Sequence, residues 1–281
     1  MKKLLTIFAL LLPLTSLTSC ADKEYVITVC ASEIPHKQIL EGVVKDVLKE
    51  KGYEIKVTTL NWTLQNHAVA NDEFDANYFQ HIPYLNTYNG DEKLVAAAKV
   101  HYERLCLYTS NTNDKTIDNG QSIVIVNDIS NVERSLQLLV EKNILTINSS
   151  CYDNNNNFTN FDTSYPNTCV TFTELYKDCT LTCVSENQLC LALNTFDFGI
   201  IPGNTALTGL KDYKNKICFG EEDENLISEK ANIIAVKESN ANSKKTIALV
   251  EALADVRVKE FIENTYGDTV IYHYENLLES K

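Results

Sequence analysis

Residues 25–59 read YVITVCASEIPHKQILEGVVKDVLKEKGYEIKVTT. The first seven residues are mostly apolar and rich in β-branched side chains, which is typical of a buried strand. From about Pro35 to Gly52 apolar residues recur at helical spacing, and proline suits the first turn of a helix while glycine suits its end. Residues 53–59 alternate apolar and polar side chains, which indicates a second strand. The segment therefore predicts two parallel strands joined by a crossover helix.

The rest of the chain continues to alternate between helical and extended patterns, without an internal repeat. We expect helices over 62–89 with an interruption near Pro83, over 130–143, over 186–193 and over 243–264; strands within 94–108 and over 122–126, 198–202 and 232–236; and a solvated, asparagine-rich loop over 148–168. Strands that alternate with helices predict an α/β protein with mainly parallel sheets.

Two polar stretches, 111–120 and 211–230, are candidate crossings between two lobes. The chain of 281 residues is long for one core and sufficient for two. We therefore expect residues 20–110 plus 231–281 to form lobe I and residues 111–230 to form lobe II. A cleft at the carboxyl ends of strands is where such sheets bind ligands.

The first nineteen residues have the features of a secretory signal peptide. Lys2 and Lys3 precede an apolar run, residues 4–14, that is too short to span a bilayer. The ending Leu-Thr-Ser-Cys20 resembles the lipobox of bacterial lipoproteins, in which this cysteine receives lipid, including palmitate. We expect cleavage before Cys20, a lipid anchor there, and a place in the cell envelope facing the periplasm or the exterior. An ordinary signal peptide with a chance cysteine is the alternative.

Charge and cysteine content exclude some classes of protein. The net charge is −13, and it becomes more negative when Lys2 and Lys3 are removed, which argues against a nucleic-acid partner. After Cys20 an even number of cysteines remains, and five of them lie within 151–190. These cysteines can be buried thiols or can form disulfides, and the sequence does not determine which of them would pair. A zinc site is disfavoured because there is no C-x-x-C pair.

A helix start after the strand 122–126 is the first candidate binding element. Ser130 and Glu133 have capping-box spacing, so we expect the helix to begin at Asn131. The free amides and the dipole of a helix start favour an anion. Asn131 and Arg134 share the first turn, and a guanidinium fork matches a carboxylate with two bonds. A surface arginine paired with a nearby acid is the alternative.

An aromatic group is the second candidate element. The segment DANYFQHIPYL, residues 75–85, places Tyr78, Phe79, His81 and Tyr84 close together. Such rings can wall an apolar side chain, and a thioether gains about 0.3–1.5 kcal/mol from a good aromatic contact. A core cluster beside a helix end is the alternative.

Both segments carry a resemblance to a known family. Residues 75–85 look like the signature of the NlpA-type lipoproteins, the MetQ-like methionine-binding receptors of ABC importers. The segment 127–136, NDISNVERSL, is similar to their second signature, and segments 34–40, 99–103 and 232–236 also fit. The resemblance spans nearly all of residues 25–270 except the loop. It implies a two-lobed, type II periplasmic-binding-protein-like fold that closes on free L-methionine and delivers it to a membrane permease.

The resemblance also implies roles for particular residues. Arg134 holds the ligand carboxylate beside Asn131, Asn232 bonds its polar end, and the remaining predicted pocket residues are Trp62, Tyr78, Phe79, His81, His101 and Asn204. The chain departs from the family's common Asn-Gly-Asn-Tyr-Ala at Pro202 and Thr205, and Arg104 replaces a usual proline. A dipeptide or another apolar amino acid therefore remains an alternative ligand.

The remaining alternatives are an enzyme, a ligand-free adhesive or structural lipoprotein, and a metal receptor. The sequence has no G-x-S-x-G, H-E-x-x-H, G-x-G-x-x-G or Walker motif, so we expect neither catalysis nor a cofactor. His81 and His101 could meet in space, but a cation site does not explain Arg134. We expect a monomer with no bound metal.

Overall fold

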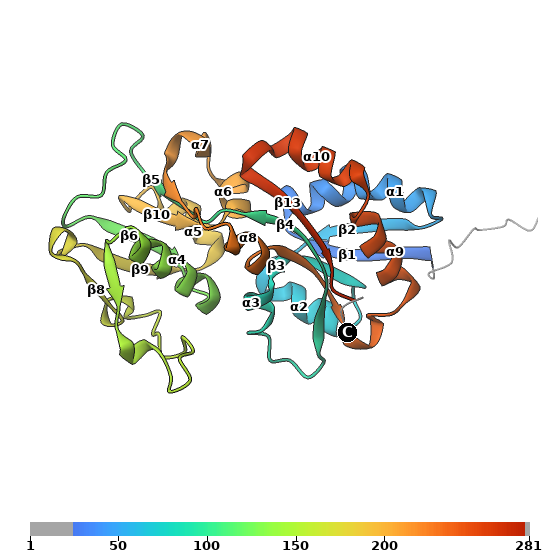
Figure 1. The fold of residues 1–281 in the computed structure, drawn as a ribbon, viewed down its shortest axis with the longest axis horizontal. Helices are drawn as coiled ribbons and strands as arrows, with labels where there is room; N and C mark the ends of the chain where they lie inside the picture. Colours follow the sequence, from blue (N-terminus) through green and yellow to red (C-terminus); the bar gives the residue numbers. More distant parts are fainter. Residues whose placement is uncertain (1–24, 279–281) are drawn as a thin grey trace, which may run out of the picture.

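The computed structural model describes residues 25–278, so the predicted signal peptide and Cys20 lie outside the described residues. Two lobes, each built on its own sheet, lie along the long axis of the molecule (Figure 1). The six-stranded sheet of lobe I has the order β13-β4-β12-β3-β1-β2, and the five-stranded sheet of lobe II has the order β11-β5-β10-β6-β9. This is the two-lobed α/β architecture that the sequence predicts.

Lobe I is assembled from both ends of the chain. Its elements are β1 (Val26–Ala31), the helical turns η2 (Glu33–Lys37) and η3 (Leu40–Val44), α1 (Lys45–Glu50), β2 (Glu54–Thr59), α2 (Trp62–Ala70), β3 (Ala76–His81), α3 (Ile82–Leu85), β4 (Leu94–Glu103), β12 (Asn232–Lys237), η7 (Glu238–Asn240), α9 (Lys244–Leu253), α10 (Val256–Tyr266), η8 (Gly267–Thr269) and β13 (Val270–Asn276). β1 pairs in parallel with β2, as the opening segment predicts. Apolar side chains of η3, α1, α9 and α10 cover one face of the sheet, and those of α2 and α3 cover the other.

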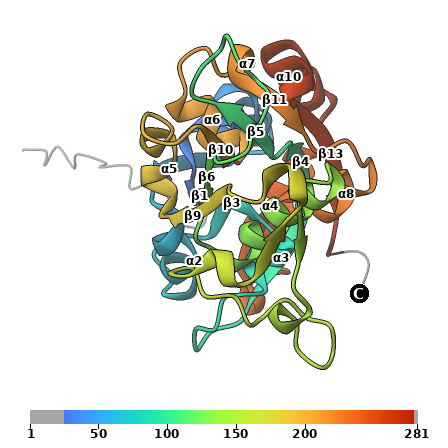
Figure 2. The same ribbon diagram turned by 90° about the vertical axis from the view of Figure 1, so that its left-hand side faces the viewer.

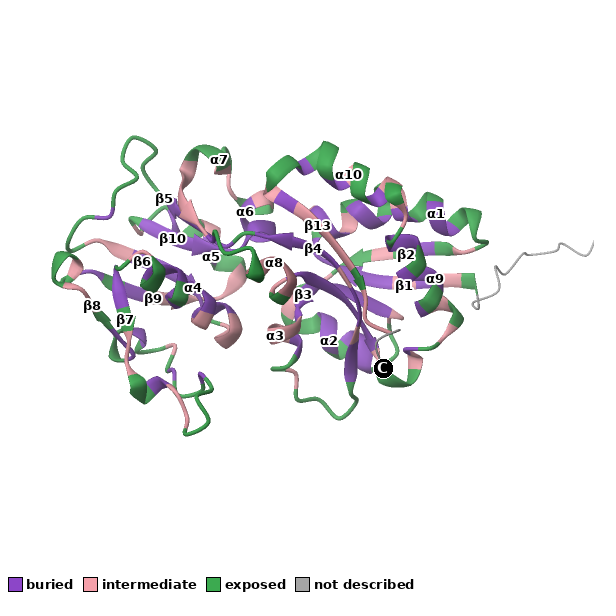
Figure 3. Ribbon diagram, viewed as in Figure 1, coloured by how far each residue is buried: buried purple, intermediate pink, exposed green. Residues whose placement is uncertain are grey.

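Lobe II is a continuous segment. Its elements are β5 (Cys106–Thr109), β6 (Ser122–Val126), α4 (Ile129–Glu141), β7 (Leu145–Ile147), η4 (Ser149–Cys151), η5 (Pro166–Thr168), β8 (Val170–Phe172), η6 (Glu174–Tyr176), β9 (Thr180–Val184), α5 (Glu186–Ala192), β10 (Phe198–Ile201), α6 (Gly203–Gly209), α7 (Tyr213–Lys216) and β11 (Ile217–Gly220). α5 and α6 cover one face of its sheet and α4 covers the other (Figure 2). The central strands of both sheets, among them β3, β4, β12, β5, β6 and β10, are mostly buried, whereas the edge strands β2, β11 and β13 are largely not (Figure 3).

The crossings between the lobes are short. β4 belongs to the first sheet and β5 to the second, so the first crossing is at Arg104 and Leu105 and not at 111–120 as predicted. The polar stretch 111–120 misled because it is only the loop that follows β5. The return crossing is residues 221–231, which contains the short helix α8 (Asn225–Glu229).

Three other expectations are wrong. β3 lies inside the region predicted as helix, because a strand buried along its whole length shows no alternation. The sheets are mixed and not mainly parallel, since β12 runs antiparallel to both β3 and β4. The predicted terminal helix is two helices, because Asp255 accepts a hydrogen bond from the Arg257 amide and starts α10.

The asparagine-rich loop is anchored by apolar side chains. Cys151, Phe158 and Phe161 are buried within it, and a disulfide joins Cys151 to Cys169. The expectation of a solvated loop is therefore wrong at these positions. The other six cysteines of the described chain are free thiols. No helix among residues 25–278 has the length and apolarity needed to cross a membrane.

Candidate ligand-binding site

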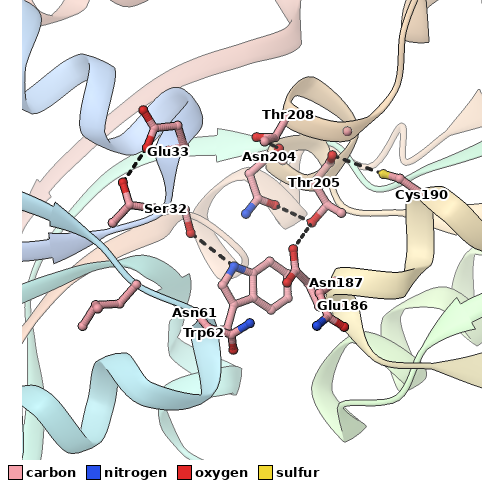
Figure 4. A pocket seen from close by; sticks show the side chains of 13 residues that line it. Ser32, Glu33, Asn61, Trp62, Glu186, Asn187, Cys190, Asn204, Thr205 and Thr208 are labelled. Atoms are coloured by element: carbon pink, nitrogen blue, oxygen red, sulfur yellow. Dashed lines mark hydrogen bonds between the residues drawn. The ribbon is translucent and has the colours of Figure 1, made fainter.

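Residues of both lobes line several spaces, and two of these spaces are neighbours that share lining residues. The smaller, which we call the inner hollow, has a volume of about 30 Å³ and is lined by Trp62, Phe79, Gln80, His81, Tyr84, Asn131, Arg134, Pro202, Asn204 and Asn232. The larger, which we call the outer chamber, has a volume of about 290 Å³ and shares Trp62 and Asn204 with the inner hollow (Figure 4). Seven of the nine predicted pocket residues line the inner hollow.

Arg134 reaches the inner hollow from the first turns of α4. The helix begins at Ile129, and Asp128 caps it by accepting a hydrogen bond from the Asn131 amide at 3.0 Å. The predicted Ser130 cap is therefore wrong, because Asp128, two residues earlier, is the capping residue and Ser130 only donates a hydrogen bond to its carboxylate. The earlier start still leaves Arg134 near the helix N-terminus, buried at 5% exposure.

A carboxylate that the sequence did not single out holds Arg134. Glu221, in the return crossing, accepts hydrogen bonds from Nε and Nη2 of Arg134, each at 2.5 Å. Burial alone would raise the pKa of Glu221, but the charge and hydrogen bonds of Arg134 outweigh it and lower the pKa. Nη2 also donates to the carbonyl of Glu103 at 3.0 Å. No hydrogen bond among the described residues uses Nη1, so this nitrogen is the free donor of an otherwise neutralised arginine.

Two amide side chains add further free donors. The Asn232 Oδ1 lies 3.0 Å from Nε2 of His36. Burial lowers the pKa of His36 to about 4, so the ring is neutral and donates a hydrogen bond from Nε2 to Asn232 Oδ1. The amide nitrogen of Asn232 therefore points away from His36. Asn204 is buried, and its Oδ1 faces the Thr205 hydroxyl at 3.5 Å. Neither amide nitrogen has a partner among residues 25–278.

His81 connects the two lobes across the inner hollow. Its Nδ1 accepts a hydrogen bond from the Tyr84 amide at 3.1 Å, which leaves Nε2 as the donor toward Asn131 Oδ1 at 3.3 Å. Burial and then the positive charge of Arg134 lower the pKa of His81 to about 3. The ring is therefore neutral at ordinary pH, and this bond joins lobe I to lobe II without a charge.

Three aromatic rings form an apolar wall. Ring centroids lie 5.4 Å apart for Phe79 and Tyr84, 6.3 Å for Trp62 and Tyr84, and 6.4 Å for Trp62 and Phe79. Trp62 is fixed by a hydrogen bond from Nε1 to Ser32 Oγ at 3.2 Å. Tyr84 belonged to the aromatic cluster in the sequence, and its place on this wall shows that the cluster serves the cleft as well as the core.

Tyr78 and His101 do not line the inner hollow, so the expectation that they do is wrong. Both are fully buried behind it and belong to a hydrogen-bonded network. The Tyr78 hydroxyl bonds to Nδ1 of His101, and Nε2 of His101 lies 2.6 Å from Oε1 of Glu103. Oε2 of Glu103 accepts a hydrogen bond from the backbone N–H of Asn204 at 2.6 Å, which links the network to lobe II. This network holds the first crossing, at Arg104 and Leu105, in place.

The same network contains a geometric group of possible metal ligands. His36, His101 and Glu103 each offer an atom within 4.8 Å of the others, and they are the one such group in the described chain. His81 does not meet His101, contrary to what a metal receptor built on that pair requires. The atoms of the group already bond to each other, to Tyr78 and to Asn232. Their arrangement is that of a structural network.

Free N–H donors and a facing aromatic wall, enclosed between two α/β lobes, define a substrate-binding protein of the two-lobed, type II class. Sequence and structure comparisons place it within that class. The NlpA lipoprotein family matches residues 27–273, and the chain belongs to this family.

Individual relatives agree with this placement. The chain is 31% identical over 250 residues to the methionine-binding lipoprotein MetQ of Bacillus subtilis, covering 87% of each chain. It is 27% identical to membrane lipoprotein TpN32 of Treponema pallidum, covering 83% of this chain and 82% of that one. A solved structure of a nutrient-binding protein from Burkholderia cenocepacia bound to methionine aligns with a TM-score of 0.76 at 25% identity, covering 88% of this chain and 99% of that chain.

Sequence reasoning missed Glu221, Glu103, His36 and Gln80 as parts of the site. Glu221 lies in a charged segment, and nothing in its neighbours distinguishes it from a solvated acid. His36 and Glu103 lie within segments that fit the family, so that fit was the available signal for them.

Proposed function

We propose that this protein is a lipid-anchored receptor that captures free L-methionine between its lobes and delivers it to an ATP-driven permease. The observation that carries the proposal is a buried arginine that lines the same inner hollow as three aromatic rings and whose Nη1 makes no hydrogen bond among the described residues. The name of the Bacillus subtilis relative and the methionine bound in the Burkholderia structure support methionine as the ligand.

The carboxylate end of the ligand is recognised by donors. Arg134 Nη1 supplies a charge-assisted hydrogen bond, which is stronger than a neutral one. Asn204 and Asn232 also line the inner hollow, and their side-chain amide nitrogens, which have no partner among residues 25–278, would complete a set of donors for carboxylate oxygens. Because Glu221 already neutralises Arg134, the site carries little net charge and suits a zwitterion better than a free anion.

The side chain of the ligand lies against the aromatic wall. Phe79, Tyr84 and Trp62 offer ring faces and edges at which a thioether gains about 0.3–1.5 kcal/mol per good contact. Shape alone discriminates weakly between apolar side chains of similar size, at about 1–3 kcal/mol per methylene. The contacts with sulfur therefore add to the preference for methionine.

Ligand entry requires the lobes to move. The inner hollow, at about 30 Å³, has room for little more than water and is too small for methionine in this arrangement. The short crossings at Arg104–Leu105 and at 221–231 are where a hinge would lie. Opening breaks the His81–Asn131 bond, and methionine then takes part of the space that these side chains fill.

The rest of the proposal concerns place and partners. The lipobox predicts attachment through Cys20, and the lipoprotein names of the relatives support an anchored location in the cell envelope. We propose that the protein acts as a monomer and catalyses no reaction, in line with its family. The permease then receives methionine when the lobes open at the membrane.

Thermal unfolding with matched ligands tests the proposal. A ligand present at about 100 times its dissociation constant adds about 2.7 kcal/mol, which for a chain of this size raises the melting temperature by roughly 5–10 °C. We expect this rise with L-methionine and at least tenfold weaker binding of methioninamide, which lacks the carboxylate charge.

A variant that removes the arginine must also remove its partner. Arg134→Ala abolishes the rise, but it leaves Glu221 buried and unpaired, so the Arg134→Met/Glu221→Leu double variant is the better probe. Equal binding of L-methionine and methioninamide would contradict the proposal. A rise with another amino acid in a full panel, and none with methionine, would identify a different ligand, while no rise with any amino acid or dipeptide would favour an adhesive lipoprotein.

A further inference from the structure

A buried carboxylate at the end of β4 contacts the binding site without lining it. The side chain of Glu103 is 4% exposed, and both of its oxygens have partners. Oε1 lies 2.6 Å from Nε2 of His101, and Oε2 accepts the hydrogen bond from the backbone N–H of Asn204. A side chain at Gly203 would place its Cβ 2.7 Å from the Cβ of Glu103, so glycine lets the start of α6 approach this closely. The carboxylate is therefore held in one position by both lobes.

The same carboxylate faces the ring of His36. Nε2 of His36 lies 3.8 Å from Glu103 Oε1 and 3.0 Å from Asn232 Oδ1, whereas Nδ1 has no hydrogen-bond partner in the described chain. The ring is neutral, so it carries one hydrogen, and the surroundings decide which nitrogen holds it. The negative charge of a carboxylate attracts an N–H group and repels a lone pair. Glu103 therefore favours the tautomer of His36 with its hydrogen on Nε2.

The tautomer of His36 decides which atom of Asn232 is available to a ligand. With the hydrogen on Nε2, the ring donates to Oδ1 of Asn232 and leaves the amide nitrogen free as a donor. With the hydrogen on Nδ1, Nε2 becomes an acceptor, and Asn232 must turn its nitrogen toward the ring and its oxygen away from it. An oxygen in that place repels a ligand carboxylate, whereas a nitrogen binds it. The choice of tautomer thus changes which ligand group the inner hollow accepts.

We propose that Glu103 is a positioning residue for ligand recognition: acting through His36, it presents the amide nitrogen of Asn232, and not its oxygen, to the ligand carboxylate. The inference rests on the proposed function, which places that carboxylate in the inner hollow. Glu103 itself contacts no ligand. It fixes the donor before the ligand arrives, so binding does not have to order the amide. The site thereby distinguishes a carboxylate from a carboxamide, which has an NH2 group in place of one oxygen.

Glu103→Gln tests this inference because it replaces one carboxylate oxygen by an NH2 group of nearly the same shape. The backbone N–H of Asn204 cannot be reversed, so we expect the glutamine oxygen to stay with it and the NH2 group to face the two histidines. His101 can accommodate this change by accepting at Nε2. His36 then holds its hydrogen on Nδ1, and Asn232 turns its oxygen toward the ligand.

Calorimetric titration of each variant with L-methionine and with methioninamide measures the effect. We expect the wild type to bind methionine at least about tenfold more tightly than methioninamide. In Glu103→Gln this ratio should fall to within about threefold, because the carboxamide can donate to the turned oxygen of Asn232. A merely structural role of Glu103 would weaken both ligands alike and leave the ratio unchanged, and that result in a folded variant overturns the inference.

The control variant is Glu174→Gln, which removes the same charge from a side chain that is 88% exposed. We expect it to leave the ratio of the two affinities at the wild-type value. A fall as large as that in Glu103→Gln would show that the ratio follows the net charge of the protein, and it would overturn the inference as well.

Nitrogen NMR of the wild type with isotope-labelled histidine needs no variant. We expect His36 to carry its hydrogen on Nε2, and the reverse tautomer overturns the inference even if Glu103→Gln does not fold.

Titration of the wild type separates this inference from the proposed function. If the wild type prefers methionine and Glu103→Gln keeps the same preference, the role of Glu103 is wrong and methionine capture stands. If the wild type binds methionine and methioninamide equally, or binds neither, the proposed function is contradicted and the inference falls with it.

Discussion

Replacing Glu221 by glutamine tests how the charge of Arg134 is shared between the carboxylate of Glu221 and that of the ligand. The carboxylate of Glu221 is buried and takes two hydrogen bonds at 2.5 Å from the guanidinium, as well as bonds from the Tyr102 hydroxyl at 2.6 Å and the Leu105 amide at 2.9 Å. Removing one charge of such a buried pair costs about 3–5 kcal/mol, because the other charge stays uncompensated. For a chain of this size the melting temperature should fall by roughly 6–20 °C.

Although Glu221→Gln lowers the stability of the unliganded protein, we expect it to increase the stabilisation that methionine provides. The carboxylate of L-methionine offers Arg134 a replacement for the lost charge, so the rise in melting temperature on adding methionine should be larger in Glu221→Gln than in the wild type. Thermal unfolding followed by circular dichroism, with and without methionine, measures both numbers.

The neighbouring residue provides the control. Glu222 has a side chain 77% exposed and pairs with Lys142 at 3.2 Å, so Glu222→Gln should change stability by less than about 1 kcal/mol. If Glu221→Gln is no less stable than Glu222→Gln, the buried pair does not hold Arg134. If methionine stabilises Glu221→Gln less than the wild type, the ligand carboxylate does not compensate the charge of Arg134 as we reason.

Three further predictions concern the helix cap, the buried histidine and the cysteines. Asp128→Ala should cost about 0.5–2 kcal/mol in chemical denaturation because it removes the cap of α4, and Ser130→Ala should cost less; the reverse order would restore the cap expected from sequence. The folded pKa of His81, about 3, is below its unfolded value near 6.5, so only the unfolded chain takes up the proton between them. The free energy of unfolding should therefore fall as the pH drops from about 6.5 to 4, and this fall should be shallower in His81→Gln; equal slopes would show that the ring is not buried in its neutral form. Alkylation of the unfolded, unlipidated chain, residues 21–281, should label six cysteines without reductant and also Cys151 and Cys169 with it, and a mass spectrum with all of them labelled at once would rule out the disulfide.

Local patterns predicted those parts of the fold that local chemistry controls. The opening strand, helix and strand follow from short-range periodicity, and so does α4. β3 could not be separated from a helix, because its pairing with β1 and β12 is decided by residues far away in the chain. The position of the first crossing also depends on which sheet β5 joins, and four residues of strand pattern contain no such information.

The site shows the same division. Arg134 is recognisable because a helix start and a family signature surround it, and its burial agrees with that reading. Its partner Glu221 comes from another element 87 residues away, so the pair exists only after folding. Tyr78 and Phe79 are adjacent in sequence and equally aromatic, but only Phe79 lines the inner hollow, because Tyr78 bonds to His101 behind the wall.

The most direct test is a crystal structure of the protein grown with L-methionine. We predict lobes closed around the amino acid, its carboxylate within about 3 Å of Arg134 Nη1, and its sulfur against the rings of Phe79, Tyr84 and Trp62. A methionine bound in the opposite direction, with its carboxylate away from the arginine, or a cleft that stays unoccupied at saturating methionine, would contradict the account.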